Sequence, residues 1–256
     1  MRVVIKVGTS TLAHQTGRLN IRRTGELCKV ISDLKNGGHD VILVSSGAIG
    51  MGLGKLGLKT RPTDIPTKQA AAAVGQCELM YTYDKLFSEY SHTVAQILLT
   101  GSDFLSAERH ENFNNTLSTL LRMGVLPIIN ENDTIATEEI KVGDNDTLSA
   151  LVAVSVKADL LVILSDVQGL YSADPHKNAD AKLIERIHGM PESLFDLAGD
   201  TAGTLGTGGM KTKLNAAKTC IAAGCDMVIA SGENPKLLYD ILEGVPKGYT
   251  RFFAKE

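Results

Sequence analysis

The sequence predicts an α/β fold, a three-layer α/β/α sandwich with a mostly parallel central sheet. Short apolar runs alternate along the chain with longer segments in which apolar residues recur at helical spacing. The runs contain few polar residues, which is typical of strands buried on both faces. Regular strand–helix alternation is typical of a parallel sheet with helices on both sides.

The elements of the first half follow this alternation. The apolar run Val3–Val7 is the first predicted strand. Apolar residues over Leu27–Leu34 fall on one face of a predicted helix, which ends at a pair of glycines. Val41–Val44 is the second predicted strand. A long helix is predicted over Thr67–Tyr90, because the segment is rich in alanine and prolines stand at its start. Val94–Leu99 is the third strand.

The middle of the chain repeats the pattern. Apolar residues over Phe113–Leu121 form another helical face, and Leu126–Ile129 is a strand. A helix is predicted over Leu148–Lys157, followed by a strand at Leu160–Leu164. An acidic stretch lies between the predicted strand Leu126–Ile129 and the predicted helix Leu148–Lys157.

The last elements are a glycine-rich loop and three shorter segments. The loop, Gly203–Gly209, opens a helix, and a strand is predicted at Met227–Ala230. A helix over Leu238–Leu242 and a short strand at Arg251–Phe253 follow. No repeat, low-complexity linker or charge block divides the chain, so one domain over residues 1–256 is expected.

Composition excludes several classes of protein. The formal net charge of -3 gives no general attraction to nucleic acid or to an anionic membrane. No apolar run approaches the roughly 18 residues of a membrane span, and the first residues lack a signal-peptide pattern. The cysteines have no metal-site or disulfide spacing, which predicts a reduced, cytoplasmic protein. They are Cys28, Cys77, Cys220 and Cys225.

The acidic stretch Asn130–Ser149 follows a buried strand, so it is expected at the carboxyl edge of the sheet, where open α/β sheets bind ligands. Its carboxylates are Glu131, Asp133, Glu138, Glu139, Asp144 and Asp146. A small hairpin is predicted over Thr134–Val142, and Asp144 or Asn145 can cap the next helix. Taken alone, the Asp-Asn-Asp tripeptide is more typical of a solvated loop.

Three glycine-rich segments at strand ends indicate phosphate binding. They are Lys6–Ser10, Ser45–Gly52 and Gly206–Lys213. Glycine lets backbone N–H groups approach an anion, and a helix N-terminus favours negative charge. Neither a Walker A motif nor the dinucleotide-binding glycine pattern occurs. Each segment alone also fits an ordinary turn, and each lysine alone fits a solvated surface.

Together these motifs resemble the glutamate 5-kinases of the amino acid kinase family. The matching segments are KVGTS at Lys6, SSGAIG at Ser45, NEND at Asn130, IKVGDND at Ile140, SDVQGLY at Ser165 and GTGGMKTK at Gly206. The resemblance implies one amino acid kinase domain, with a substrate-binding part at about residues 1–155 and a nucleotide-binding part at about residues 156–256. Many such proteins carry a C-terminal PUA domain, so the resemblance implies a short form without it.

The implied reaction is ATP-dependent phosphorylation of the γ-carboxylate of L-glutamate to L-glutamyl 5-phosphate, the first step of proline biosynthesis. A carboxylate is already ionised at neutral pH, so the reaction needs charge neutralisation rather than a general base. By resemblance, Lys6 and Lys213 contact the transferred and leaving phosphates. Asp146 orients the two lysines.

The resemblance also assigns binding residues and partners. The expected glutamate contacts are Ser46, Asp133 and Asn145, with Asp144 as a further candidate. The expected ATP contacts are Lys6, Gly8, Gly47, Ser165, Asp166, Thr207, Gly208, Gly209, Met210, Lys211, Thr212 and Lys213. Mg²⁺ is expected mainly on the ATP phosphates, with no metal site formed by the protein itself.

Regulation and assembly follow from the same resemblance. Proline is the expected feedback inhibitor, a homodimer or homotetramer is the expected assembly, and functional coupling to glutamyl phosphate reductase is expected. Two alternatives remain open. One is another kinase of the family, of the acetylglutamate kinase or aspartokinase type, and the other is a non-catalytic nucleotide-binding sensor.

Overall fold

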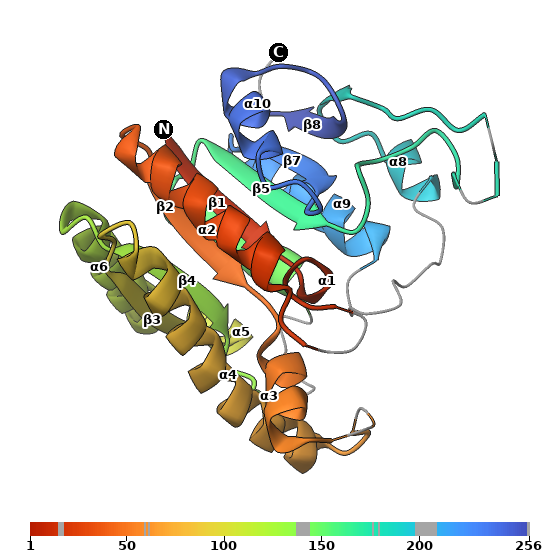
Figure 1. The fold of residues 1–256 in the computed structure, drawn as a ribbon. Helices are drawn as coiled ribbons and strands as arrows, with labels where there is room; N and C mark the ends of the chain where they lie inside the picture. Colours follow the sequence, from red (N-terminus) through yellow and green to blue (C-terminus); the bar gives the residue numbers. More distant parts are fainter. Residues whose placement is uncertain are drawn as a thin grey trace.

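The computed structural model describes residues 1–14, 18–58, 60, 62–136, 144–175, 177–178, 180–197 and 209–254. Its strands are β1 (Arg2–Val7), β2 (Asp40–Ser45), β3 (Val94–Leu99), β4 (Leu126–Glu131), β5 (Leu160–Ser165), β6 (Arg186–His188), β7 (Asp226–Ser231) and β8 (Tyr249–Phe253). They form one sheet in the order β3-β4-β2-β1-β5-β7-β8-β6 (Figure 1).

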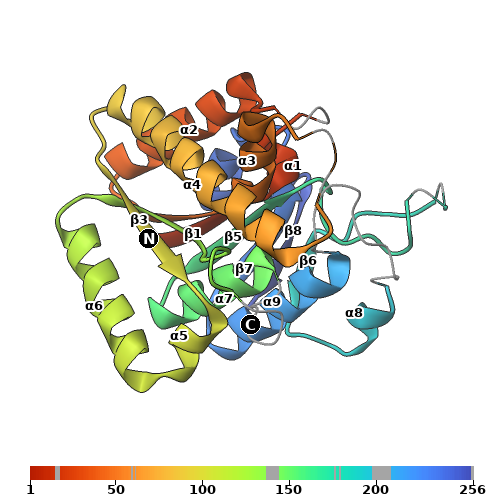
Figure 2. The ribbon, with the colours of Figure 1, turned by 90° about the horizontal axis from the view of Figure 1, so that it is seen from below.

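Helices cover both faces of this sheet. They are α1 (Thr9–Leu12), α2 (Ile21–Asn36), α3 (Ala48–Leu56), α4 (Ile65–Ser88), α5 (Gly101–Leu105), α6 (Ala107–Arg122), α7 (Asn145–Ser155), α8 (Ser193–Asp196), α9 (Met210–Ala222) and α10 (Leu237–Glu243). In Figure 2, α2 and α4 lie above the sheet and α6, α7 and α9 lie below it. The predicted three-layer sandwich is confirmed.

The central sheet is mostly parallel, as predicted. Strand β1 pairs in parallel with β2 and β5, and β4 pairs in parallel with β2 and β3. Strand β7 continues the parallel sheet beside β5, while β8 runs antiparallel to β7. The carboxyl ends of β1, β2, β4, β5 and β7 therefore meet at one edge of the sheet.

Two hydrophobic cores form because successive side chains of a strand point to opposite faces. Val3, Ile5 and Val7 of β1 join the core that includes residues of α2 and α4. Val4 joins the core that includes residues of α6, α7 and α9. All four of these side chains are fully buried. Continuous apolar strands are therefore explained by burial on both sides of the sheet.

Close packing of α3 on α4 depends on glycine. A Cβ added at Gly75 would lie 1.7 Å from the carbonyl oxygen of Ala48, and one added at Gly52 would lie 1.8 Å from that of Ala71. The sequence pattern did not predict α3 as a separate helix, because glycines at alternate positions lower its helix propensity. The contact with α4 stabilises it instead.

Several helices begin earlier than the sequence pattern predicts. Helix α4 begins at Ile65, two residues earlier than predicted, because the side chain of Asp64 accepts a hydrogen bond from the Thr67 N–H at 2.8 Å. Pro66 therefore lies inside the first turn, where its missing N–H leaves no bond unmade. The short strand β6 and the short helices α1, α5 and α8 were also not predicted.

Parts of two predicted features lie outside the described residues. Most of the predicted hairpin over Thr134–Val142, residues 137–142, lies outside the described residues. The described part, up to Ala136, forms a turn in which the N–H groups of Ile135 and Ala136 donate to the Asn132 carbonyl. The glycine-rich loop is described only from Gly209 onward. Among the helices of the described residues, none is long and apolar enough to cross a membrane.

Candidate active site

An ion cluster of three side chains lies at the carboxyl edge of the sheet. Lys6 comes from β1, Asp146 from the first turn of α7 and Lys213 from the first turn of α9. The Lys6 Nζ lies 2.7 Å from Asp146 Oδ1, and the Lys213 Nζ lies 3.2 Å from Asp146 Oδ2. Three elements that are far apart in sequence thus place these groups in contact.

A hydroxyl completes the contacts of the carboxylate. Thr212 Oγ1 lies 2.8 Å from Asp146 Oδ2 and 2.8 Å from the Gly209 carbonyl oxygen, and it can donate to either. The Lys213 Nζ also donates to the Gly209 carbonyl, at 3.4 Å. The first turn of α9 is therefore joined to α7 through the carboxylate of Asp146.

The cluster is nearly closed to solvent and carries a net positive charge. The side chains of Lys6, Asp146 and Lys213 are 10%, 1% and 5% exposed. Burial acts to raise the pKa of Asp146, but the charges of Lys6 and Lys213 outweigh it and lower the pKa to about 2. The carboxylate is therefore ionised at neutral pH, and it holds both ammonium groups without cancelling their combined charge. Such a site suits an oligoanionic ligand.

A second polar cluster adjoins the first, because Asn145 precedes Asp146 on α7. Asn145 Nδ2 donates to Ser46 Oγ at 2.7 Å and to Asn130 Oδ1 at 3.0 Å. Asn130 Nδ2 in turn donates to Gln76 Oε1 at 3.0 Å, from helix α4. Two predicted glutamate contacts, Ser46 and Asn145, thus lie in direct contact with each other.

The remaining predicted glutamate contacts have different surroundings. Asp144 caps α7, with its side chain accepting from the Thr147 N–H at 2.8 Å and from the Thr147 hydroxyl at 3.2 Å. Burial raises the pKa of Asp144 above its ordinary value. Asp133 lies half-buried in the turn after β4, at the same edge of the sheet. The capping of α7 by Asp144 was predicted from residue type and position alone, whereas the glutamate contacts were predicted by resemblance.

Glycines lie next to three of the elements that form the site. Gly8 follows β1, and a Cβ there would lie 3.5 Å from the Lys6 Nζ. Gly47 precedes α3 with a φ of 107°, in the left-handed region that favours glycine. Gly209 precedes α9. Gly8 and Gly209 therefore leave the backbone close to the ion cluster free of side-chain bulk.

The other predicted ATP contacts are spread around this edge. Ser165 and Asp166 lie at the end of β5, where the serine hydroxyl donates to the Asp166 carboxylate at 2.9 Å. Met210 packs against the core below the sheet, and the side chain of Lys211 is exposed. Thr207 and Gly208 lie outside the described residues.

The sequence prediction left out two amide side chains of the site, Gln76 and Gln96, and the contact of Thr212 with Asp146. It assigned Thr212 to ATP alone, and it treated the segments that contain Gln76 and Gln96 only as a helix and a strand. Gln76 Nε2 donates to Gln96 Oε1 at 3.0 Å. The available signal was a lone amide in an otherwise small or apolar stretch, AAAAVGQ for the helix and VAQILL for the strand.

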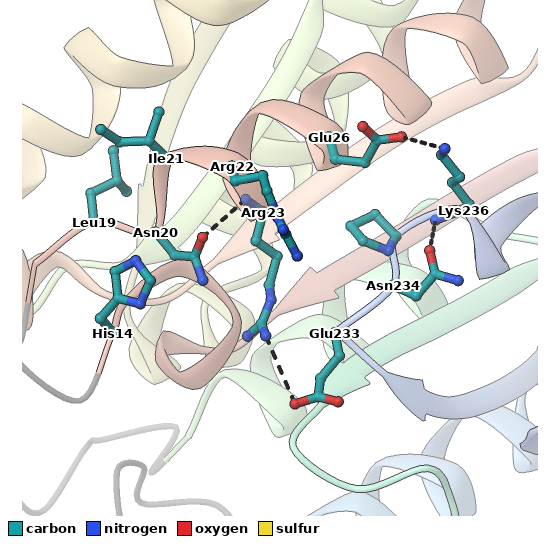
Figure 3. Close-up of a pocket in the computed structure, with 11 residues that line it drawn as sticks. His14, Leu19, Asn20, Ile21, Arg22, Arg23, Glu26, Glu233, Asn234 and Lys236 are labelled. Atoms are coloured by element: carbon teal, nitrogen blue, oxygen red, sulfur yellow. Dashed lines mark hydrogen bonds and ion pairs between the residues drawn. The ribbon is translucent and has the colours of Figure 1, made fainter.

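A separate cavity of about 580 Å³ lies between the start of α2 and the loop before α10 (Figure 3). Arg23 reaches across it, with Nη1 donating to the Ser10 carbonyl at 3.2 Å and Nη2 lying 3.8 Å from Glu233. The Lys236 Nζ lies 3.5 Å from Glu26. The charged groups mostly pair with one another, and the residues of the ion cluster are not among those that line the cavity.

Among the described residues, no three His, Cys, Asp or Glu side chains gather in a way that would hold a metal ion. Both oxygens of Asp146 are engaged, one by Lys6 and the other by Lys213 and Thr212. Its carboxylate therefore serves to hold cations of the protein.

The chain as a whole matches known proteins. The family model of the amino acid kinase family matches residues 1–231. A glutamate 5-kinase from Clostridium perfringens is 51% identical over 260 residues, covering 100% of this chain and 96% of that protein. A glutamate 5-kinase from Caldanaerobacter subterraneus is 52% identical over 250 residues, covering 98% of this chain and 67% of that protein.

Solved structures share the fold at low identity. Carbamate kinase from Giardia lamblia, bound to AMP-PNP, matches with a TM-score of 0.71 and 18% identity, over 100% of this chain and 98% of that chain. UMP kinase from Ureaplasma parvum matches with a TM-score of 0.67 and 14% identity, over 98% of each chain. At this identity the likeness concerns the fold alone.

Proposed function

The chain belongs to the glutamate 5-kinases of the amino acid kinase family, and from this membership we propose that it phosphorylates the γ-carboxylate of L-glutamate with ATP. The product is L-glutamyl 5-phosphate, and the step opens proline biosynthesis. The observation that best supports the proposal is the buried Lys6–Asp146–Lys213 cluster beside Ser46 and Asn145.

The proposed reaction requires charge neutralisation. The γ-carboxylate is ionised at neutral pH, so it attacks the γ-phosphorus of ATP without a general base. The obstacle is the approach of one anion to another, and phosphoryl transfer is catalysed by positioning and electrostatic stabilisation. Lys6 and Lys213 supply two positive charges for the transferred and leaving phosphates. Asp146 holds both ammonium groups in place.

Mg²⁺ is expected to arrive on the nucleotide. Asp146 already binds two ammonium groups, so the ATP phosphates and water would supply most of the ligands of Mg²⁺. When bound, Mg²⁺ neutralises part of the phosphate charge. Backbone N–H groups beside Gly8, Gly47 and Gly209 bind phosphate oxygens in this proposal, because small residues there allow close approach.

We assign about residues 1–155 to glutamate binding and about residues 156–256 to nucleotide binding. Ser46, Asp133 and Asn145 bind glutamate, and Asp144 acts mainly through its cap of α7. The ATP contacts of the second part are Ser165, Asp166, Thr207, Gly208, Gly209, Met210, Lys211, Thr212 and Lys213. A cytoplasmic homodimer or homotetramer that passes its labile product to glutamyl phosphate reductase completes the proposal.

The proposed reaction is tested by trapping its product. Purified protein is incubated with MgATP, hydroxylamine and either L-glutamate, L-aspartate or N-acetyl-L-glutamate, and hydroxamate and ADP are measured. Hydroxamate with L-glutamate alone is the expected result. Hydroxamate formation with another acid would identify that acid as the substrate instead of L-glutamate. If none of the three acids caused ADP release, the protein would not be a carboxylate kinase.

Asp133→Ala is expected to raise the KM for glutamate about tenfold or more while kcat changes little. The reason is that Asp133 would pair with the ammonium group of the substrate, a contact present before and during phosphoryl transfer. Steady-state kinetics at saturating MgATP measure this. An unchanged KM for glutamate would remove Asp133 from the binding site.

Proline is expected to inhibit by binding where glutamate binds. Proline shares the ammonium and α-carboxylate groups of glutamate, so one set of contacts can hold either ligand. Increasing glutamate at constant proline should restore the full rate. Inhibition that persists at saturating glutamate would place proline at a separate site.

A further inference from the structure

A chain of amide side chains runs from the edge strand of the sheet to the N-terminus of α7. Gln76 on α4 occupies its middle, between Gln96 of β3 and Asn130 of β4. We infer that Gln76 is a positioning residue that turns the side-chain oxygen of Asn145 toward the ammonium group of the substrate. The inference rests on the proposed function and extends it to the choice of substrate.

The direction of each amide in the chain follows from two backbone groups. The N–H of Glu131 can only donate, and it donates to Asn130 Oδ1 at 2.9 Å. Asn130 Nδ2 must therefore face Gln76 and needs an acceptor there, which Gln76 Oε1 provides at 3.0 Å. A flipped amide at Gln76 would bring two NH₂ groups together.

The orientation passes on to Asn145. The Ser45 carbonyl can only accept, and Asn145 Nδ2 points to it at 3.4 Å and to Asn130 Oδ1 at 3.0 Å. Nδ2 is thus fixed on the side of β2 and β4, which leaves Oδ1 on the other side of the amide. Gln76 supports this arrangement because it keeps the acceptor oxygen of Asn130 facing Asn145.

The fixed oxygen of Asn145 is an acceptor for a ligand. Asn145 Oδ1 is buried and accepts no hydrogen bond from the described residues. A buried acceptor is normally paired, so a donor from the ligand is the expected partner. An ammonium group supplies N–H donors and positive charge, whereas an acid without an amino group supplies neither. The chain of amides therefore favours amino acids over plain dicarboxylic acids.

The test compares two ligands that differ only in the amino group, L-glutamate and glutarate. Their binding to the whole protein is measured by calorimetry, or for glutarate by inhibition of hydroxamate formation. Gln76→Met, which can neither accept nor donate these bonds, should weaken L-glutamate binding about tenfold. Glutarate binding, kcat and the KM for MgATP should each change less than about threefold.

Two further variants separate positioning from general stability. Gln76→Glu keeps an acceptor for Asn130 Nδ2 and should retain L-glutamate binding within about threefold of the original protein. Leu79→Ala removes a buried side chain from the same helix without touching an amide, and it should not change the ratio of the two affinities. Gln76→Ala serves for the same comparison if the methionine variant does not fold.

The possible outcomes are distinct. Equal weakening of L-glutamate and glutarate in Gln76→Met, or equal loss in the methionine and glutamate variants, would overturn the inference. The same change of the affinity ratio in Leu79→Ala would overturn it too. If the original protein formed no hydroxamate from glutamate, the proposed function itself would fail, whatever the variants did.

Discussion

Asp146→Asn is expected to lower kcat at least 100-fold, about 3 kcal/mol in the activation barrier, with the KM for glutamate changing only a few-fold. Asparagine keeps the shape of the side chain but removes the charge that holds Lys6 and Lys213. The two ammonium groups would repel each other and leave the positions in which we propose that they bind the transferred and leaving phosphates. Losses of about 10² to 10³ are typical when one preorganised electrostatic group is removed.

Initial rates with MgATP and glutamate, measured at saturation of each, give the effect on kcat. Asp226→Asn is the matched control, since Asp226 also pairs with a cation, Arg251, at 2.9 Å, at the opposite end of β7 from the site. Its turnover should stay close to that of the unaltered chain. Near-normal kcat in Asp146→Asn would show that the carboxylate does not hold the catalytic lysines.

The same substitution has a pH signature in stability. The pKa of Asp146 in the folded chain is about 2, below its ordinary value near 4 in an unfolded chain. The carboxylate therefore stabilises the fold fully above pH 4, by about 2 to 3 kcal/mol, and this contribution is lost as the pH falls toward 2. Denaturant unfolding at several pH values should show that the stability difference between the unaltered chain and the Asp146→Asn variant changes by about this amount over that window. A constant difference would contradict the lowered pKa.

The resemblance to a known family singled out the three residues of the ion cluster, whereas each lysine taken alone fits a solvated surface. Lys6, Asp146 and Lys213 each belong to a short motif at a predicted strand end or helix start, and parallel strands bring their carboxyl ends to one edge. The motifs therefore located these residues without knowledge of their contacts. The distances show the additional part played by Thr212, whose hydroxyl binds the same carboxylate.

Interactions through glutamine and glycine were harder to predict. Gln76 lies in a helix whose composition indicates only helix propensity, and its partner Asn130 is 54 residues away in sequence. Helix α3 contains glycines that argue against a helix, and its close contact with α4 explains one of them, Gly52. Both depend on tertiary contacts, which local patterns do not contain.

Gly75→Ala is expected to destabilise the fold by about 3 kcal/mol or more, although alanine is the better helix former. The added Cβ would lie 1.7 Å from the Ala48 carbonyl oxygen and 2.4 Å from the Gly52 nitrogen, so α3 and α4 must separate. Helix α3 starts directly after Ser46 and Gly47, so this movement should also weaken glutamate binding. Denaturant unfolding and glutamate titration measure the two effects.

Gly25→Ala, also a substitution within a helix, is expected to change the stability of the fold in the direction opposite to Gly75→Ala. Gly25 lies within α2, and a Cβ there would meet nothing within 4 Å. Alanine should therefore stabilise the fold by about 0.5 to 1 kcal/mol, through helix propensity and a less flexible unfolded chain. Two glycine-to-alanine changes in helices should thus shift stability in opposite directions. If both stabilised the fold, the close contact of α3 with α4 would not be what makes glycine necessary at position 75.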